Sequence, residues 1–307
     1  MINQLSLLDE GQFIGNKEKT KTIISASRRT DIPAFYYEWL QEVLEKGQVE
    51  VPNPRFPDKK YAVDLEPSAV HSIVLWSKDF SNVLKDPMYL KEYNLYFQYT
   101  INNYSRIIEP NVPEYRETLA TLEGLLKVFI PQQFNIRFDP VILSTKGENN
   151  PTPGMPEKAR LKAFEKLCRD LRALGMEKCR ITTSYLEMYG HVRNRLLKTN
   201  LDLISADENL QTEIFSHLAE ISQKYGFALY SCASPILEKI KGIHRGHCID
   251  GEFLERLFGE KTNKSKDGGQ RKACGCSHSR DIGVYSKSCK GMKCLHGCKY
   301  CYVMDSD

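Results

Sequence analysis

The chain has 307 residues, of which 41% are hydrophobic, and its formal net charge is +4. This length allows one barrel-sized domain with a small appendage, and no apolar run is long enough to predict a membrane-spanning helix. The first residues lack the apolar core and cleavage site of an export signal. We therefore expect a cytoplasmic protein whose ten cysteines serve a metal or redox function rather than disulfides.

Strands and helices are predicted to alternate along most of the chain. Short apolar runs predict strands over residues 22–26, 71–76, 95–101, 134–143, 180–185 and 227–232. Residues 49–51 and 61–65 predict an extra pair of short strands around a Pro-rich turn. Apolar residues at helical spacing predict helices between the strands, and a capping box of Ser205 with Glu208 is expected to open the one that Gly226 ends. This alternation predicts an α/β fold with a (β/α)6-like partial TIM barrel.

Composition divides the chain into three parts. We expect an N-terminal extension at residues 1–21, a (β/α) barrel domain at residues 22–259, and a basic linker with a cysteine-rich module at residues 260–307. The last part is strongly basic, with ten Lys or Arg against two Asp between residues 261 and 301. Such an excess indicates either a solvated positive face or attraction of an anionic partner such as nucleic acid.

Polar side chains at the carboxyl ends of the predicted strands are the first candidate site residues. In parallel α/β barrels these ends converge on one mouth, where working residues lie. The arginines after the first strand suit an anion, because a guanidinium binds carboxylate or phosphate bidentately. Arg137 and Asp139 would be costly inside an apolar strand unless they are paired or face a polar cavity. The candidates in chain order are Arg28, Arg29, Asp31, Lys78, Tyr99, Asn102, Arg137, Asp139, Ser184 and Ser234.

Three cysteines near the end of the sequence are the most informative motif. Cys294, Cys298 and Cys301 have C-x3-C-x2-C spacing, and Tyr300 precedes the third. Structural zinc usually takes four ligands and an iron–sulfur cube has four corners. Three thiolates therefore leave one coordination position for something else.

This run resembles the C-x3-C-x-aromatic-C signature of radical S-adenosylmethionine enzymes. The resemblance implies that Cys294, Cys298 and Cys301 hold three irons of a 4Fe-4S cluster and that Tyr300 lies against the adenine. S-adenosylmethionine would chelate the fourth iron through its amino and carboxylate groups. An electron donor would reduce the cluster, which would then cleave the sulfonium to a 5′-deoxyadenosyl radical. In that family the motif normally follows the first barrel strand, so here the tail would have to fold back across the barrel mouth.

A second resemblance covers most of the chain. With its Ser-Arg-Arg-Thr-Asp run at residues 27–31 and Cys-Gly-Cys near the end, the sequence resembles the bacterial domain-of-unknown-function 1848 family, which carries the same terminal signature. This likeness implies no substrate. The second strand ends in Trp76-Ser77-Lys78 and lacks the Gly-Gly-Glu run with which many radical S-adenosylmethionine enzymes hold the methionine amino group. We expect another polar group to take that role.

Several readings of the cysteines stay open. A zinc knuckle could complete the terminal triad with one of Cys274, Cys276, Cys289, His278 or His296. A second site, for an auxiliary cluster or a zinc, could combine Cys248, Cys274, Cys276 and Cys289. His244 and His247 are either loop residues or ligands, and Cys168 is expected in the core because it shares a helical apolar stripe.

The functional prediction is a radical S-adenosylmethionine enzyme acting on an unknown substrate. The first alternative is a zinc-bearing barrel protein that binds nucleic acid without radical chemistry, and the second is an enzyme with another cofactor and a structural cysteine module. Residues 4–8, QLSLL, resemble the short motif that docks bacterial replication and repair proteins on the sliding clamp. The other reading of these residues is an apolar arm packed on the protein's own barrel.

Overall fold

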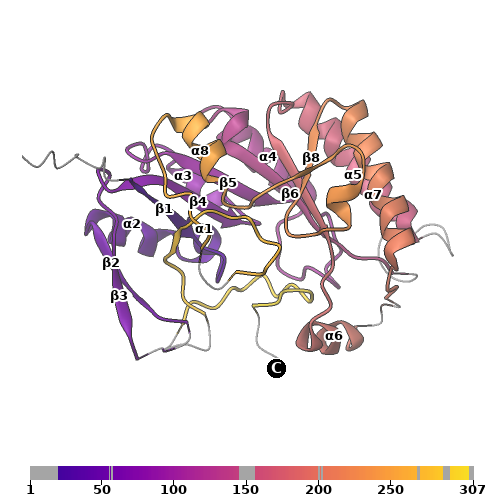
Figure 1. Cartoon of the computed structure of the whole chain (residues 1–307), viewed down its shortest axis with the longest axis horizontal. Helices are drawn as coiled ribbons and strands as arrows, with labels where there is room; N and C mark the ends of the chain where they lie inside the picture. The colour runs from indigo at the N-terminus through magenta and orange to yellow at the C-terminus, as the bar shows by residue number, and fades with distance from the viewer. Residues whose placement is uncertain are drawn as a thin grey trace, which may run out of the picture.

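A parallel sheet of eight strands forms the centre of the molecule (Figure 1). The computed structural model describes residues 20–54, 56, 58–144, 156–199, 201, 203–267, 270–285 and 291–303. The strand order is β10-β1-β4-β5-β6-β7-β8-β9, and every neighbouring pair is parallel. The strands are β1 (Thr22–Ala26), β4 (Val70–Ser77), β5 (Leu95–Thr100), β6 (Phe134–Val141), β7 (Arg180–Tyr185), β8 (Ala228–Ser231), β9 (Ile243–Arg245) and β10 (Arg280–Asp281).

The sheet is open, because β9 pairs with β8 and β10 pairs with β1, and the two edge strands do not pair with each other in the described part of the chain. The α/β fold and all six predicted strands of the main pattern are confirmed, whereas a closed barrel is not formed. The two edge strands were not predicted. They span three and two residues, too few for an apolar run to distinguish them from loops.

Helices connect most of the strands. They are α1 (Ile32–Phe35), α2 (Tyr37–Glu45), α3 (Ser81–Lys85), α4 (Tyr115–Leu125), α5 (Pro156–Ala173), α6 (Gly190–Leu197), α7 (Glu208–Lys224) and α8 (Gly251–Phe258). The predicted capping box at Ser205 is wrong, because Asp207 is the N-cap of α7 and its carboxylate accepts a hydrogen bond of 2.9 Å from Leu210 N. The predicted extra strands form an antiparallel hairpin of β2 (Gln48–Pro52) and β3 (Lys60–Asp64).

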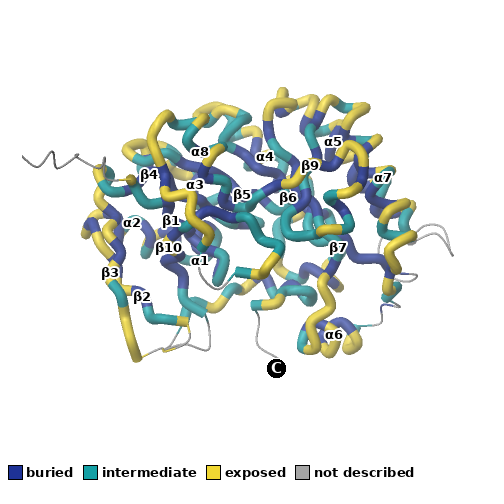
Figure 2. Tube along the Cα trace, viewed as in Figure 1, coloured by how far each residue is buried: buried dark blue, intermediate teal, exposed yellow. Residues whose placement is uncertain are grey.

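The two faces of the sheet differ in polarity because successive strand residues point to opposite sides. On one face, Ile73, Phe97 and Phe138 belong to the main apolar core, together with buried residues of α2, α4, α5 and α7. Figure 2 shows this buried centre in dark blue. The other face carries a smaller cluster, in which Val74 and Tyr96 meet Leu254 of α8 and neighbouring apolar groups. Polar residues cover the rest of that second face, with Gln98, Asn135, Arg137, Asp139, Thr182 and Ser184 along β5, β6 and β7.

The tail returns to the sheet after α8. It adds β10 beside β1, and residues 291–303 then lie between the end of β1 and helix α6 (Figure 1, yellow). This return places both of the tail's cysteine-bearing stretches at the carboxyl ends of the parallel strands.

Candidate functional site

A cavity of about 1800 Å³ lies at the carboxyl ends of the parallel strands. Typical small-molecule pockets measure roughly 300–1000 Å³, so this cavity has room for two ligands. Most of the candidates from the sequence line it, namely Arg28, Arg29, Asp31, Lys78, Arg137, Asp139, Ser184, Ser234, Tyr300, Cys248, Cys274, Cys276, Cys294, Cys298 and Cys301.

Two candidates do not line the cavity. Tyr99 is fully buried on the other face of the sheet, where its ring packs on Phe80 at a centroid distance of 4.7 Å. Asn102 lies behind the cavity wall and holds the backbone of Asp139, accepting from Asp139 N at 2.7 Å and donating to Asp139 O at 3.0 Å. Neither side chain faces the space where a ligand would bind.

The two arginines after β1 already have carboxylate partners. Asp281 of β10 accepts hydrogen bonds from Ser27 Oγ at 2.6 Å and Arg28 N at 2.9 Å, and the Arg28 guanidinium lies 3.6 Å from it. Arg28 also contacts Asp267 at 3.3 Å, and Arg29 Nε lies 3.9 Å from Asp281. An anion bound here would share these arginines with the two aspartates. Sequence reasoning missed Asp281 because its strand was not predicted.

Arg137 and Asp139 of β6 form an ion pair in the cavity wall. The Ser184 hydroxyl donates a hydrogen bond to the same carboxylate, and the Arg137 guanidinium lies 5.3 Å from the centre of the Trp76 ring. Burial alone would lower the pKa of Arg137, but the charge of Asp139 and a contact with Cys248 raise it above its ordinary value. Both conditions proposed for this pair, a partner and a polar cavity, are met.

The terminal triad lies in the cavity wall near the ends of β1 and β4. Cys298 is buried, whereas Cys294 and Cys301 are half-buried. The thiols of Cys294 and Cys298 interact electrostatically with each other and with that of Cys301. Burial raises the pKa of Cys294 to about 12 and that of Cys298 well above its usual range, and nearby Lys78 offsets part of this effect. Burial thus favours the protonated thiols of Cys294 and Cys298, and a bound metal would supply the charge that makes them thiolates.

Hydrogen bonds from three different segments hold the triad's loop. His296 Nε2 lies 2.8 Å from Asp31 Oδ2, and its Nδ1 lies 3.2 Å from Asn111 O. The backbone of the loop is bound through Tyr36 OH to Lys293 O, Asn111 Nδ2 to Leu295 O, Lys299 N to Ile108 O and Arg195 to Cys301 O. These bonds fix where this loop lies.

A buried charge network supports Tyr300 beside the triad. Glu109 accepts hydrogen bonds from Lys78 Nζ at 2.7 Å, from Asn102 Nδ2 at 3.2 Å and from the Tyr300 hydroxyl. Burial would raise the pKa of Glu109, but Lys78 and the hydrogen bonds lower it below its ordinary value. Lys78 Nζ also lies 5.4 Å from the centre of the Tyr300 ring. Glu109 was not among the sequence candidates, because it follows β5 only after a further loop.

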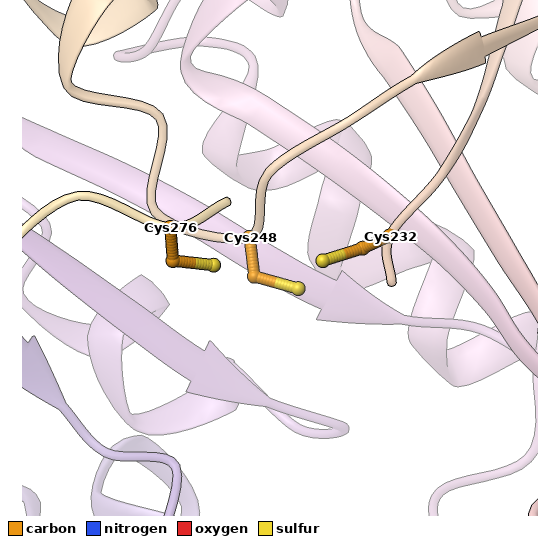
Figure 3. Close-up of side chains that lie close together, drawn as sticks. All are labelled: Cys232, Cys248 and Cys276. Carbon is orange, nitrogen blue, oxygen red and sulfur yellow. The ribbon is translucent and has the colours of Figure 1, made fainter. Parts of the chain in front are cut away.

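A second group of cysteines lies on another wall of the cavity. The sulfur atoms of Cys232, Cys248 and Cys276 all lie within 4.8 Å of one another (Figure 3). The thiol of Cys274 interacts with those of Cys232 and Cys276. Three of the four residues of the predicted second site thus come together. Cys232 completes this group of four, and Cys289 lies outside the described residues.

Cys232 could have been found from the sequence. It directly follows β8 (Ala228–Ser231), so it occupies the same kind of position, at the carboxyl end of a parallel strand, as the other candidates. Cys168, by contrast, is wholly buried in the core as expected. Residues 4–8, with the predicted clamp motif, lie outside the described part of the chain.

The fold and the site define an α/β protein with an open parallel sheet and a polar, cysteine-lined cavity at its carboxyl edge. The family model described as a domain of unknown function, DUF1848, matches residues 23–303, and the chain belongs to this family. No curated protein gives a significant match. Within the described residues, no helix combines the length and the apolar character needed to cross a membrane.

Proposed function

We propose that this protein is a radical S-adenosylmethionine enzyme whose cluster is held by Cys294, Cys298 and Cys301. The observation that carries the proposal is the position of this three-cysteine loop, with Tyr300, in the wall of a large cavity at the carboxyl ends of parallel strands. Active sites of parallel α/β folds lie at this edge of the sheet.

The donor set fits a cluster better than a single zinc ion. Tetrahedral zinc with Zn–S bonds of about 2.3 Å brings its thiolates to about 3.8 Å from one another. The three sulfurs of the triad are not all within 4.8 Å of one another, whereas those of Cys232, Cys248 and Cys276 are. A cluster places each thiolate on a different iron, so its ligands lie further apart.

Three of the described candidates for a fourth zinc ligand at the triad are engaged elsewhere. His296, one candidate for a zinc knuckle, uses both ring nitrogens, at 2.8 Å from Asp31 and 3.2 Å from Asn111 O. Cys274 and Cys276, two further candidates, lie with the second group of cysteines. An open position is what chelation by S-adenosylmethionine requires.

Cys294, Cys298 and Cys301 would hold the cluster, which would supply the reductive cleavage of S-adenosylmethionine that starts hydrogen abstraction from the substrate. The chain's own residues bind and orient the ligands. Tyr300 offers a ring held by Glu109 and Asn102, against which the adenine can lie. Asp139, which lines the cavity, is the acceptor we propose for the methionine amino group, in place of the missing Gly-Gly-Glu run.

The test is anaerobic purification followed by iron and sulfide analysis, electron paramagnetic resonance, and incubation with dithionite and S-adenosylmethionine. The intact protein should show a signal that S-adenosylmethionine alters, and it should release 5′-deoxyadenosine. Cys298→Ala should abolish both, whereas the matched control Cys168→Ala, in the core of α5, should keep them. Reduced, iron-loaded protein that releases no 5′-deoxyadenosine would overturn the proposal.

A second candidate is a zinc-bearing protein that binds nucleic acid, and the basic tail supports it. Part of that charge is already paired, since Lys264 lies 2.7 Å from Glu255 and Arg271 pairs with Glu187. Binding through Lys and Arg falls steeply with salt because counterions are released from the phosphates. Titration with DNA and RNA at two salt concentrations separates the candidates, and no association at low salt would exclude this one.

A further inference from the structure

Four thiols converge at the carboxyl ends of β8 and β9, away from the terminal triad. Cys232 follows β8, Cys248 follows β9, and Cys274 and Cys276 come from the tail just before β10. Figure 3 shows the side chains of Cys232 and Cys248 pointing toward each other, with Cys276 beside Cys248. All four cysteines are free thiols. Free thiols packed against one another, with a cavity on one side, are a typical arrangement of metal ligands.

The spacing of the sulfurs matches one ion. A tetrahedral zinc thiolate has sulfur–sulfur separations of about 3.8 Å, from Zn–S bonds of about 2.3 Å. The sulfurs of Cys232, Cys248 and Cys276 lie within 4.8 Å of one another, and the Cys274 thiol interacts with those of Cys232 and Cys276. Three sulfurs therefore have the closeness that a structural zinc site requires, and Cys274 beside them is the fourth thiol available.

The surroundings supply the positive charge that such a site needs. Four thiolates around a divalent cation carry a net charge of −2, which is costly in a partly buried position. Arg137 Nη1 lies 3.3 Å from Cys248 Sγ, and Arg28 and Arg271 also interact electrostatically with cysteines of the group. The backbone N–H of Ile249 points at Cys276 Sγ at 3.5 Å. Hydrogen bonds to ligating sulfur are the expected outer shell of a metal thiolate.

The connectivity gives the ion a structural role. Cys232 and Cys248 belong to the β8–β9 edge of the sheet, whereas Cys274 and Cys276 lead into β10 at the opposite edge. Hydrogen bonds already join these parts, with Ser277 N donating to Ile249 O at 2.9 Å and Ser277 Oγ accepting from Gly251 N at 3.0 Å. One ion bound by all four cysteines would tie the two open edges together.

We propose that Cys232, Cys248, Cys274 and Cys276 bind one zinc ion that joins the β9 edge of the sheet to the segment entering β10. This site is independent of the terminal triad and of any radical chemistry.

The experiment uses the full chain with Cys294, Cys298 and Cys301 replaced by Ala, which removes the triad as a metal site. Purified protein should hold about one zinc per chain and no sulfide, and cobalt substitution should give the absorption of a tetrahedral thiolate complex. Adding Cys232→Ser or Cys248→Ser should lower bound zinc to less than about a tenth, whereas Cys179→Ser, in the core, should leave it unchanged.

Two results would overturn the proposal. Triad-free protein that contains iron and sulfide in place of zinc would make the site a cluster, and folded protein that binds neither zinc nor cobalt would leave the thiols as simple packing. If Cys248→Ser does not fold, the absorption spectrum of cobalt bound to the triad-free protein tests the proposal instead. A spectrum typical of octahedral cobalt, or of cobalt with few thiolate ligands, would exclude coordination by four sulfurs. Failure of the radical proposal would appear instead as a missing 5′-deoxyadenosine product from the intact chain.

Discussion

The two cysteine groups reach the same cavity in opposite ways. The terminal triad comes from one loop of eight residues, 294–301, which hydrogen bonds from several elements hold in place. The second group collects its cysteines from three separate segments between residues 232 and 276, and its sulfurs are the closer together. The first group is thus held by hydrogen bonds from elsewhere in the protein. The second brings together thiols that, in our proposal, enclose one ion.

Arg137 offers the strongest way to test this comparison. It pairs with Asp139 inside the cavity wall and touches Cys248 of the second group at 3.3 Å. Arg137→Met should destabilise folding by about 3–5 kcal/mol in urea unfolding, because it leaves a largely buried carboxylate without its cation. It should also weaken zinc retention by the second group while iron at the triad persists.

The control for this change is Arg245→Met. Arg245 Nε lies 3.6 Å from Glu238, but its side chain is 59% exposed, so its loss should cost less than about 1 kcal/mol. Equal effects of the two substitutions would show that Arg137 contributes only as an ordinary surface charge.

His296→Ala should act on the triad alone. The imidazole is buried and bridges Asp31 and the backbone of Asn111, so its removal leaves a buried carboxylate oxygen without one of its partners. We expect a loss of about 1–3 kcal/mol in the free energy of unfolding. Iron content should fall while zinc in the second group stays constant, as measured by metal analysis of the same sample.

A histidine of the same tail provides the control. His278 lies two residues after Cys276, and its backbone N–H bonds to Ser265 O at 2.8 Å. His278→Ala should leave the iron content unchanged. Loss of zinc and iron together in His296→Ala would contradict the separation of the two sites.

The same contrast explains what could be predicted from the sequence. The triad can be picked out from the sequence because its three cysteines share one short stretch, where their spacing alone carries the signal. The six longer strands could be predicted because each contains a buried apolar run. Most of the residues that line the cavity could then be predicted, because they follow the carboxyl ends of these strands. The pairing of Arg137 with Asp139 followed from the cost of burying either charge alone.

The remainder depends on contacts between segments far apart in the chain. Asp281 binds the backbone of Arg28 from a strand of two residues, which no periodicity can identify. Glu109 reaches Lys78 and Tyr300 only after the tail has folded over the sheet. The position of Cys232 after β8 is visible in the sequence, but its thiol partners come from other segments that the order of the strands brings beside it.

The smallest expected effect on stability is that of replacing Arg271. It tests whether protein contacts or a metal hold the second group together. Arg271 pairs with Glu187, but the two side chains are 61% and 52% exposed, so the pair should contribute less than about 1 kcal/mol and should weaken with salt. Arg271→Ala in the zinc-loaded protein should therefore barely change the unfolding midpoint in urea.

After zinc removal by a chelator, limited proteolysis should cut within residues 260–276 several times faster. It should spare residues 291–303, which hydrogen bonds from other elements hold in place. Equal protection of the first stretch with and without zinc would mean that packing, and not the ion, holds the second group together.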